Sequence, residues 1–295
     1  MKKSYFKLNV EDGLFKMLSS MPQWWRELIE DNELYCNIRK NNRINIYYRG
    51  ASIMSLSCKD DKIEAEIHNY YLGFEKDLCD KLNIKYGNVK CRPEEIICML
   101  PSIKKRVEAN KKNIACFEGD EINGKNFSSE KFIQSQMYIN DKSYIDTEFA
   151  LRLDDGTDIR IDLVKLSEKG EVCFEELKLI DDGRLKPSRG KRAEILTQMD
   201  SYERFLTEAA KLKGSNGEHI IVEYYTKVLQ IMDKIGVLRV NLKPLSVRNY
   251  VSLYIEQTYI RKHTKRDAAI KTIQKVCEGL HSNIEDVIRD YNSIK

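Results

Sequence analysis

Two acids and a lysine lie inside apolar stretches in the second half of the chain. Glu176 and Lys178 are two residues apart within residues 174–180, and Asp162 lies within residues 160–164. Side chains two residues apart on a β-strand face the same side of the sheet. Burying a carboxylate or an ammonium among apolar side chains is costly unless the charge is paired or has a task. These three residues are therefore the first candidates for chemistry.

Asp162, Glu176 and a third acid, Glu148, are expected on three neighbouring strands, where their carboxylates can converge. Hard divalent cations such as Mg²⁺ bind carboxylate oxygens, keep several waters and take substrate phosphate as a further ligand. A lysine beside such an ion can orient or deprotonate a water and stabilise charge on the phosphate. The set favours metal-assisted hydrolysis. The alternatives are a salt bridge between Glu176 and Lys178 on a half-exposed sheet face, and a surface position for Asp162.

Hydrophobic periodicity and turn residues predict the elements that must position these side chains. Three strands are expected at residues 146–153, 158–166 and 171–180, and the tight turns between them predict an antiparallel meander. A short helix at residues 129–137 precedes the meander, and an amphipathic helix at residues 191–211 follows it. Further elements are expected as a helix at residues 218–235, strands at 237–242 and 250–259, and helices at 267–280 and 283–291.

These residues resemble the PD-(D/E)xK nuclease superfamily, and in particular its RecB-like and λ-exonuclease-like members. The resemblance rests on Asp162, on Glu176-Leu177-Lys178 one hairpin further on, and on the helix motif Gln198-Met199-Asp200-Ser201-Tyr202, which matches Gln-x-x-x-Tyr. It covers residues 129–259, although Ile161 stands where the family's name has a proline. The resemblance implies an α/β (α+β) fold with a restriction-endonuclease-like core, a central mixed β-sheet flanked by helices.

The resemblance also implies a role for each member of the set. Asp162 and Glu176 would bind Mg²⁺, or Mn²⁺ as a substitute, with the backbone carbonyl of Leu177 as a further ligand. Lys178 would position the attacking water.

Gln198 and Tyr202 are one helical turn apart. By the resemblance they would help to hold the phosphate backbone and order the site, while Glu148 would be an additional acid near the metal. Because Tyr202 also lies on the apolar stripe of its helix, core packing is the alternative for this residue.

A basic loop follows the third expected strand and would lie beside the metal. Neutralising phosphates dominates the affinity of proteins for nucleic acid, so the loop is a candidate nucleic-acid-binding segment. The alternative is a solvated loop whose charge Asp181 and Asp182 partly offset. Its positively charged residues are Arg184, Lys186, Arg189, Lys191 and Arg192.

The first part of the chain has the pattern of a separate α+β unit. A helical stretch over residues 14–28 is followed by a three-stranded meander at residues 44–48, 52–58 and 62–68, then by helices at 74–82 and 93–110. A polar, glycine-containing stretch at residues 119–124 is typical of a domain boundary. We therefore expect domains at residues 1–115 and 116–295, with the first choosing the substrate or binding a protein partner.

Composition limits the class of protein, the presence of a membrane segment and the kinds of metal site. The chain has 295 residues, of which 42% are hydrophobic and 33% are charged, which is typical of a folded globular protein. No apolar run reaches the roughly 20 residues that cross a bilayer, and no signal peptide is recognised, so we expect a cytoplasmic protein without a membrane segment. The eight cysteines form no Cys-x-x-Cys pair and no two histidines have ligand spacing, which disfavours a zinc site.

The sequence thus predicts a Mg²⁺-dependent nuclease that hydrolyses phosphodiester bonds, with DNA favoured over RNA as substrate. The alternative from another class is an inactive nucleic-acid-binding or assembly module that retains the nuclease fold. An enzyme of another kind that uses the same carboxylates is a third interpretation.

Overall fold

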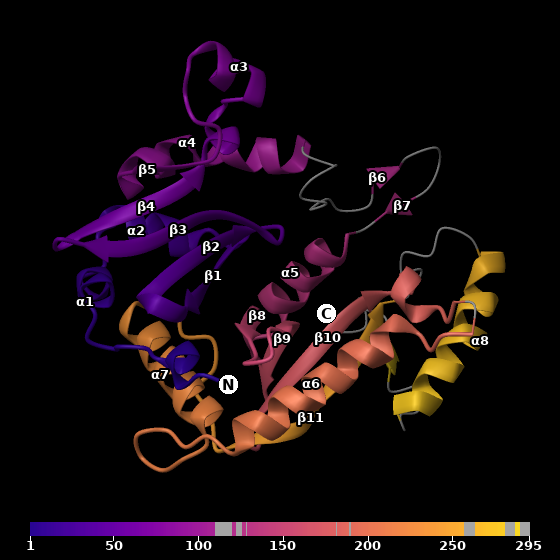
Figure 1. Ribbon diagram of the computed structural model, residues 1–295. Coiled ribbons are helices and arrows are strands. Elements are labelled where there is room, and N and C mark those ends of the chain that lie inside the picture. The colour runs from indigo at the N-terminus through magenta and orange to yellow at the C-terminus, as the bar shows by residue number, and fades with distance from the viewer. Residues whose placement is uncertain are drawn as a thin grey trace. The chain divides into compact units, whose positions relative to one another are not determined.

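The computed structural model describes residues 1–109, 120–121, 126–127, 129–180, 182–188, 190–256, 263–280 and 287–289. Contacts divide the chain into two units. The C-terminal unit comprises Met1–Phe6, Glu118–Tyr225 and Val240–Lys295, and the N-terminal unit comprises Lys7–Phe117 and Thr226–Arg239. Each unit contains a five-stranded sheet with helices, so the chain is a mixed α+β protein (Figure 1).

The domain boundary expected between residues 115 and 116 lies two residues before the boundary between the two units, which falls between Phe117 and Glu118. Residues 226–239, expected with the second half of the chain, group instead with the N-terminal unit. The indole N–H of Trp25 donates to the carbonyl of Ile235 at 2.9 Å. Local patterns along the chain carry no signal for such a contact between residues far apart in sequence.

The sheet of the C-terminal unit has the strand order β12-β11-β10-β9-β8. Its strands are β8 Tyr144–Arg152, β9 Asp158–Leu166, β10 Glu171–Leu179, β11 Ser246–Glu256 and β12 Ile288–Arg289. The first three pair antiparallel, as the tight turns predict, whereas β11 is parallel to β10. A parallel pair requires a crossover connection, and the chain crosses over through α6 Glu194–Ala210 and α7 Ile220–Lys234.

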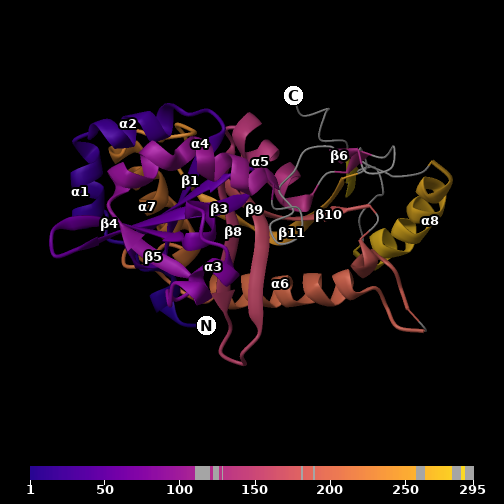
Figure 2. The ribbon, with the colours of Figure 1, turned by 90° about the horizontal axis from the view of Figure 1, so that it is seen from above.

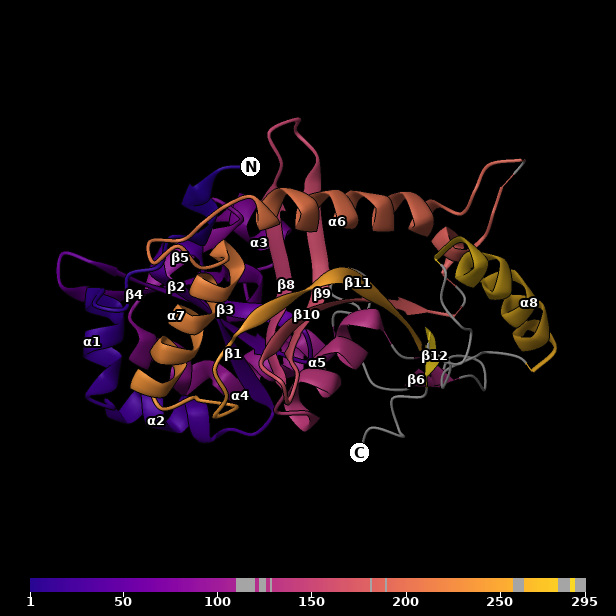
Figure 3. The same cartoon turned by 90° about the horizontal axis from the view of Figure 1, so that it is seen from below.

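Two helices of the C-terminal unit approach β10. Helix α5, Glu130–Asn140, begins at Ser129, whose hydroxyl accepts the backbone N–H of Phe132 and caps the helix. Helix α6 packs its apolar stripe against β9 and β11. Figures 2 and 3 show α5 and α6 on opposite sides of strands β8, β9 and β10. Side chains from two directions therefore reach the same strand.

The N-terminal unit is built on an antiparallel sheet of order β1-β2-β3-β4-β5. The expected meander is β2 Arg43–Tyr48, β3 Ala51–Lys59 and β4 Lys62–His68, and the flanking strands are β1 Leu34–Arg39 and β5 Asn88–Cys91. The sequence does not predict the two flanking strands, because β1 is buried without alternation and β5 is short. The helices are α1 Gly13–Ser19, α2 Gln23–Glu30, α3 Lys76–Lys81 and α4 Pro93–Ala109.

Two expected elements are wrong, and a third lies mostly outside the described residues. The helix expected over residues 14–28 is two helices, because Met21 has a φ of 53° and Pro22 lacks an N–H. Residues 237–242 form no strand, and Leu238 and Leu242 are exposed there. Of the helix expected at residues 283–291 only 287–289 are described, and Ile288–Arg289 forms β12.

The remaining elements are short or peripheral to the site. They are the hairpin strands β6 Asp120–Glu121 and β7 Asn126–Phe127, the helix α8 His263–Leu280, and the 3₁₀ helices Lys3–Phe6, Lys40–Asn42, Asn69–Leu72 and Gly183–Leu185. Across the part of the chain that the structure describes, no helix is both long enough and apolar enough to cross a bilayer.

Candidate active site

Asp162, Glu176 and Lys178 come together on one face of strands β9 and β10. The pairing of Leu163 with Glu175 places Asp162 opposite Glu176, and Lys178 follows two residues later on the same face. Its ammonium Nζ donates to Oε1 of Glu176 and lies 3.3 Å from Oδ2 of Asp162. Glu176 and Lys178 are each only 1% exposed. The set is therefore a buried charge cluster rather than a salt bridge on a half-exposed sheet face.

The backbone of Leu177 joins the two strands within this cluster. Its N–H donates to Oδ2 of Asp162 at 2.9 Å, and its carbonyl accepts from Nζ of Lys178 at 2.5 Å. Two carboxylates and one carbonyl thus point oxygen atoms at the same ammonium. These oxygens are of the kind that hard divalent cations bind.

Helix α6 holds Glu176 from above the sheet. Nε2 of Gln198 donates to Oε1 of Glu176 at 2.7 Å, and the hydroxyl of Tyr202 lies 2.8 Å from Oε2. The same hydroxyl accepts from Gln198 at 2.5 Å and contacts the carbonyl of Arg160 on β9. Tyr202 is also 2% exposed and belongs to the packed stripe of α6. In this structure Gln198 and Tyr202 hold the carboxylate of Glu176 in place. Tyr202 contributes both to the packing of α6 and to this hydrogen bonding.

Sequence reasoning missed Glu130, the first residue of α5. Its Oε1 lies 3.8 Å from Nζ of Lys178, and its Oε2 lies 3.8 Å from Nη2 of Arg184. A second residue of α5, Gln134, donates to the backbone carbonyl of Asp162. Ser129 followed by an acid is a recognisable helix start, but nothing local predicts that this helix start lies beside β10.

Burial and mutual charge shift the protonation of the cluster. Burial and the charge of Asp162 raise the pKa of Glu176 to about 8, and burial raises the pKa of Glu130 to about 7. Burial alone would lower the pKa of Lys178, but the charges of Asp162 and Glu176 outweigh it and raise that pKa above its ordinary value. The ammonium therefore stays charged at neutral pH. Three acids around one ammonium favour an additional cation or a retained proton.

The donor set fits Mg²⁺ in kind. Among the described residues, no three His, Cys, Asp or Glu side chains form a ready-made metal cluster. Mg²⁺ usually takes only one or two protein carboxylates and keeps several waters. Asp162, Glu176 and the carbonyl of Leu177 supply oxygens of this type around one point, where Lys178 provides the positive charge in this structure.

Glu148 lies opposite Asp162 on β8 with a left-handed backbone. Its neighbours in sequence pair with residues 163 and 161, and its φ is 53°. This conformation is unfavourable for a residue other than glycine, asparagine or aspartate. The carboxylate lies 3.2 Å from Nζ of Lys131 and 3.5 Å from Nη2 of Arg160. The Glu148 carboxylate is thus paired with the side chains of Lys131 and Arg160 beside the cluster.

The expected basic loop is only partly available for phosphate. Arg184 is held by the carboxylate of Asp182, with Nη2 at 2.6 Å, and Arg192 pairs with Asp200 at 2.6 Å. Lys186 and Lys191 are exposed, and Arg189 lies outside the described residues.

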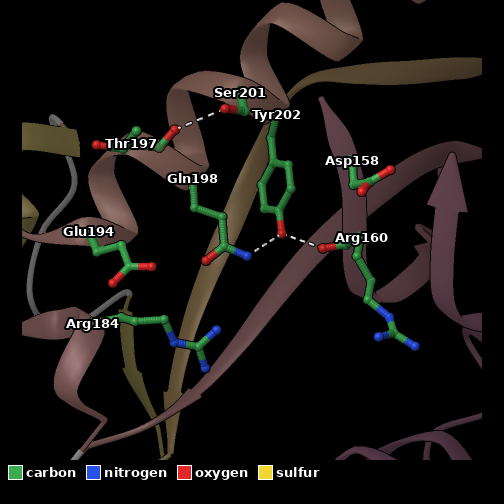
Figure 4. Close-up of a pocket in the computed structure, with 8 residues that line it drawn as sticks. All are labelled: Asp158, Arg160, Arg184, Glu194, Thr197, Gln198, Ser201 and Tyr202. Carbon is green, nitrogen blue, oxygen red and sulfur yellow. Dashed lines mark hydrogen bonds between the residues drawn. The ribbon is translucent and has the colours of Figure 1, made fainter. Parts of the chain in front are cut away.

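A cavity of about 380 Å³ lies beside the cluster (Figure 4). Figure 4 shows Gln198 and Tyr202 in the middle of its lining, with arginine side chains on both sides. Gln198 and Tyr202 also contact Glu176, so the cavity and the charge cluster share a wall. The lining residues are Asp158, Arg160, Arg184, Glu194, Thr197, Gln198, Ser201 and Tyr202.

Chemically, this site offers buried oxygens for a cation, an ammonium beside them, and an adjoining cavity for a ligand. No protein-family model, curated protein or solved structure matches this chain. The chemistry of the site is therefore the basis for assigning a function.

Proposed function

We propose that this protein is a metal-dependent nuclease whose active site is formed by Asp162, Glu176 and Lys178. The observation that carries the proposal is the buried cluster itself. A carboxylate and an ammonium that are each 1% exposed, inside a packed sheet, are costly to maintain. Their contacts with Asp162 and with Gln198 hold them in a single arrangement beside a cavity. Such preorganised charge is the usual requirement for hydrolysing a phosphodiester.

We further propose that the C-terminal unit is a restriction-endonuclease-like core. Its antiparallel strands β8, β9 and β10, its parallel strand β11 and the helical crossover between β10 and β11 support this. The position of α5 before the sheet agrees with the same arrangement.

In this proposal each residue has a defined task. Asp162, Glu176 and the carbonyl of Leu177 would hold Mg²⁺ or Mn²⁺, which when bound would offset charge that develops on the phosphate. Lys178 orients the attacking water with its ammonium. Gln198 keeps the Glu176 carboxylate in place through its 2.7 Å hydrogen bond.

The test is a cleavage assay on linear duplex DNA, circular duplex DNA, single-stranded DNA and RNA, with Mg²⁺, with Mn²⁺ and with EDTA. Lys178→Ala is compared with Lys169→Ala, which removes an exposed lysine from a turn of the same unit. We expect cleavage that needs the metal and is lost only in Lys178→Ala. DNA is the proposed substrate on the resemblance, and the RNA arm tests that choice. The circular substrate distinguishes internal cutting from cutting at an end.

A non-catalytic nucleic-acid-binding or assembly module remains the second candidate, because one observation favours it. Nζ of Lys178 contacts both Asp162 and Glu176, so the fold itself partly neutralises these carboxylates and the cluster can serve the fold alone. Absence of cleavage of every substrate by folded protein, with nucleic-acid binding retained in Lys178→Ala, supports this candidate. Binding of Mg²⁺ without cleavage of nucleic acid points instead to an enzyme of another kind.

A further inference from the structure

The cavity beside the charge cluster is lined by residues with polar or charged groups, and an arginine lies on each of two sides (Figure 4). Arg160 comes from β9 and Arg184 follows β10. Thr197 and Ser201, four residues apart on α6, also line the cavity, and the Ser201 hydroxyl donates to the backbone carbonyl of Thr197 at 3.1 Å. The cavity volume of about 380 Å³ is at the small end of ligand pockets, which are roughly 300–1,000 Å³.

The positive charges in this cavity are held in place by acids outside it. Glu148 lies 3.5 Å from Nη2 of Arg160, whose side chain is 70% exposed. Asp182 engages Nε and Nη2 of Arg184, so among the described residues Nη1 remains for a ligand. A guanidinium held in this way loses less conformational freedom when it binds a phosphate.

The two acids in the lining differ in whether a neighbouring arginine pairs with the carboxylate. Asp158 is paired with Arg152 through two contacts, at 2.8 and 3.1 Å, so its charge is offset. Glu194, at the first residue of α6, is exposed in the lining near Arg184 (Figure 4). The lining therefore has two arginines and two acids, and with Asp158 already paired, Glu194 is the lining acid that opposes an anion at Arg184 (Figure 4).

We propose that this cavity is a subsite for the sugar-phosphate of a single nucleotide adjacent to the scissile bond. Arg160 and Arg184 bind the phosphate oxygens, and the hydroxyl of Thr197 contacts the sugar. The proposal rests on the proposed nuclease function and adds the mode of substrate recognition. Tyr202 lines the cavity and also holds Glu176, so a strand bound here passes directly into the charge cluster.

This lining recognises the backbone and not the base. Among the described lining residues only Tyr202 is aromatic, and it is 2% exposed, so its ring offers no face for stacking a base. Phosphate contacts fix position but carry no sequence information. The subsite therefore predicts binding of one strand without regard to its base sequence.

The experiment measures binding of a fluorescent single-stranded oligonucleotide of about 12 nucleotides to the full chain, by anisotropy in EDTA at several salt concentrations. Arg160→Ala and Arg184→Ala are each compared with Arg204→Ala. Arg204 is an exposed arginine of the same helix layer that pairs with Asp155 outside the cavity. We expect each cavity variant to weaken binding about tenfold, because one phosphate contact is lost. The slope of the logarithm of the binding constant against the logarithm of the salt concentration should also become shallower by about one. Arg204→Ala stays within about twofold of wild type.

Two further variants test the cavity without removing an arginine. Thr197→Trp fills it from an exposed position and should weaken binding, while Glu194→Gln removes the opposing acid and should strengthen it. Thermal unfolding followed by circular dichroism confirms that each variant is folded. Oligonucleotides of different base composition should bind alike.

The outcomes separate this subsite from the nuclease function. If Arg160→Ala and Arg184→Ala bind like Arg204→Ala while Lys178→Ala abolishes cleavage, the subsite is wrong and the nuclease function stands. If wild type cleaves nothing but the cavity variants lose binding, the nucleotide subsite stands and the catalytic proposal is wrong. Strong preference for one base sequence also overturns the subsite.

Discussion

At the scale of single residues, Lys178 is the positively charged residue at the centre of the cluster of acids. Its Nζ contacts carboxylates of Asp162 and Glu176, and lies 3.8 Å from Glu130. Removing one partner from a buried ion pair is far more damaging than replacing both, because an unpaired charge remains in a poorly solvated place. If the cluster binds a divalent cation as proposed, the stability of the protein and its affinity for that cation are linked through this one side chain.

We predict that Lys178→Met, which keeps most of the side-chain volume, lowers the free energy of unfolding by about 3–5 kcal/mol in EDTA. Mg²⁺ at millimolar concentration should restore part of this loss, because the folded state alone binds the cation. Urea unfolding with and without Mg²⁺ measures both effects, with Lys169→Met as the control. An identical loss with and without Mg²⁺ would contradict a cation site at Asp162 and Glu176.

The contacts and the backbone conformation of Glu148 indicate a role that its sequence position does not. The resemblance implies a carboxylate near the metal, whereas the structure shows it against Lys131 and Arg160 with a φ of 53°. A strained backbone is maintained only where its surroundings impose it. We infer that Glu148 is a positioning residue for Arg160.

We predict that Glu148→Gly unfolds with a free energy about 1 kcal/mol higher than Glu148→Ala, because glycine adopts a positive φ without strain. Both variants should weaken oligonucleotide binding, and Glu148→Gln should retain more of it than Glu148→Ala. Urea unfolding and anisotropy measure the two effects separately. Oligonucleotide binding equal to that of wild type in both Glu148→Gly and Glu148→Ala would show that Glu148 has only a structural role.

At the scale of elements, α6 acts on the sheet through two side chains one turn apart. Gln198 and Tyr202 reach both oxygens of the Glu176 carboxylate, and Tyr202 also contacts the carbonyl of Arg160. The helix thus ties β9 to β10 at the cluster. This arrangement assigns Tyr202 to positioning the Glu176 carboxylate, which is catalytic in the proposed function.

Tyr202→Phe removes the hydroxyl and keeps the ring, so we expect kcat to fall about tenfold or more while KM changes little. The matched control is Tyr144→Phe, since Tyr144 is a buried tyrosine 2.7 Å from the neighbouring carboxylate Glu175. Steady-state kinetics in Mg²⁺ gives both constants. A rise in KM alone would indicate that Tyr202 contacts the phosphate backbone instead.

The sequence predicts most of the site because its signals are local. Asp162, Glu176 and Lys178 lie on one hairpin, so strand alternation and turn length suffice to bring them together. Glu130 and Arg160 are different, because their roles depend on where α5 and the cavity lie in three dimensions. Of the flanking strands, β5 pairs with β4 across an intervening helix, whereas β1 pairs with the neighbouring β2 but is buried without the alternation that would reveal a strand.

At the scale of the whole molecule, the two units are not consecutive segments of chain. The second half of α7, from Thr226, belongs with the N-terminal unit. There Ile231 and Ile235 are fully buried, and the Ile235 carbonyl accepts from Trp25. A cut near residue 117 therefore separates α7 from the side chains that cover it.

We predict that a fragment comprising residues 118–295 does not unfold cooperatively, because it exposes the apolar face of α7. Thermal unfolding and binding of a hydrophobic dye, compared with the full chain, test this expectation. A cooperative transition within a few degrees of that of the full chain would show that the C-terminal unit folds without residues 7–117.

The central claim, that Asp162 belongs to a catalytic metal site, is tested most directly by single-turnover cleavage of labelled DNA by Asp162→Asn in Mg²⁺. The amide keeps the size of the side chain and can still accept the N–H of Leu177, so the fold should be retained. We predict a rate at least about a hundredfold below that of wild type, because a charged oxygen ligand is lost. A rate within a few fold of wild type would contradict the proposed active site.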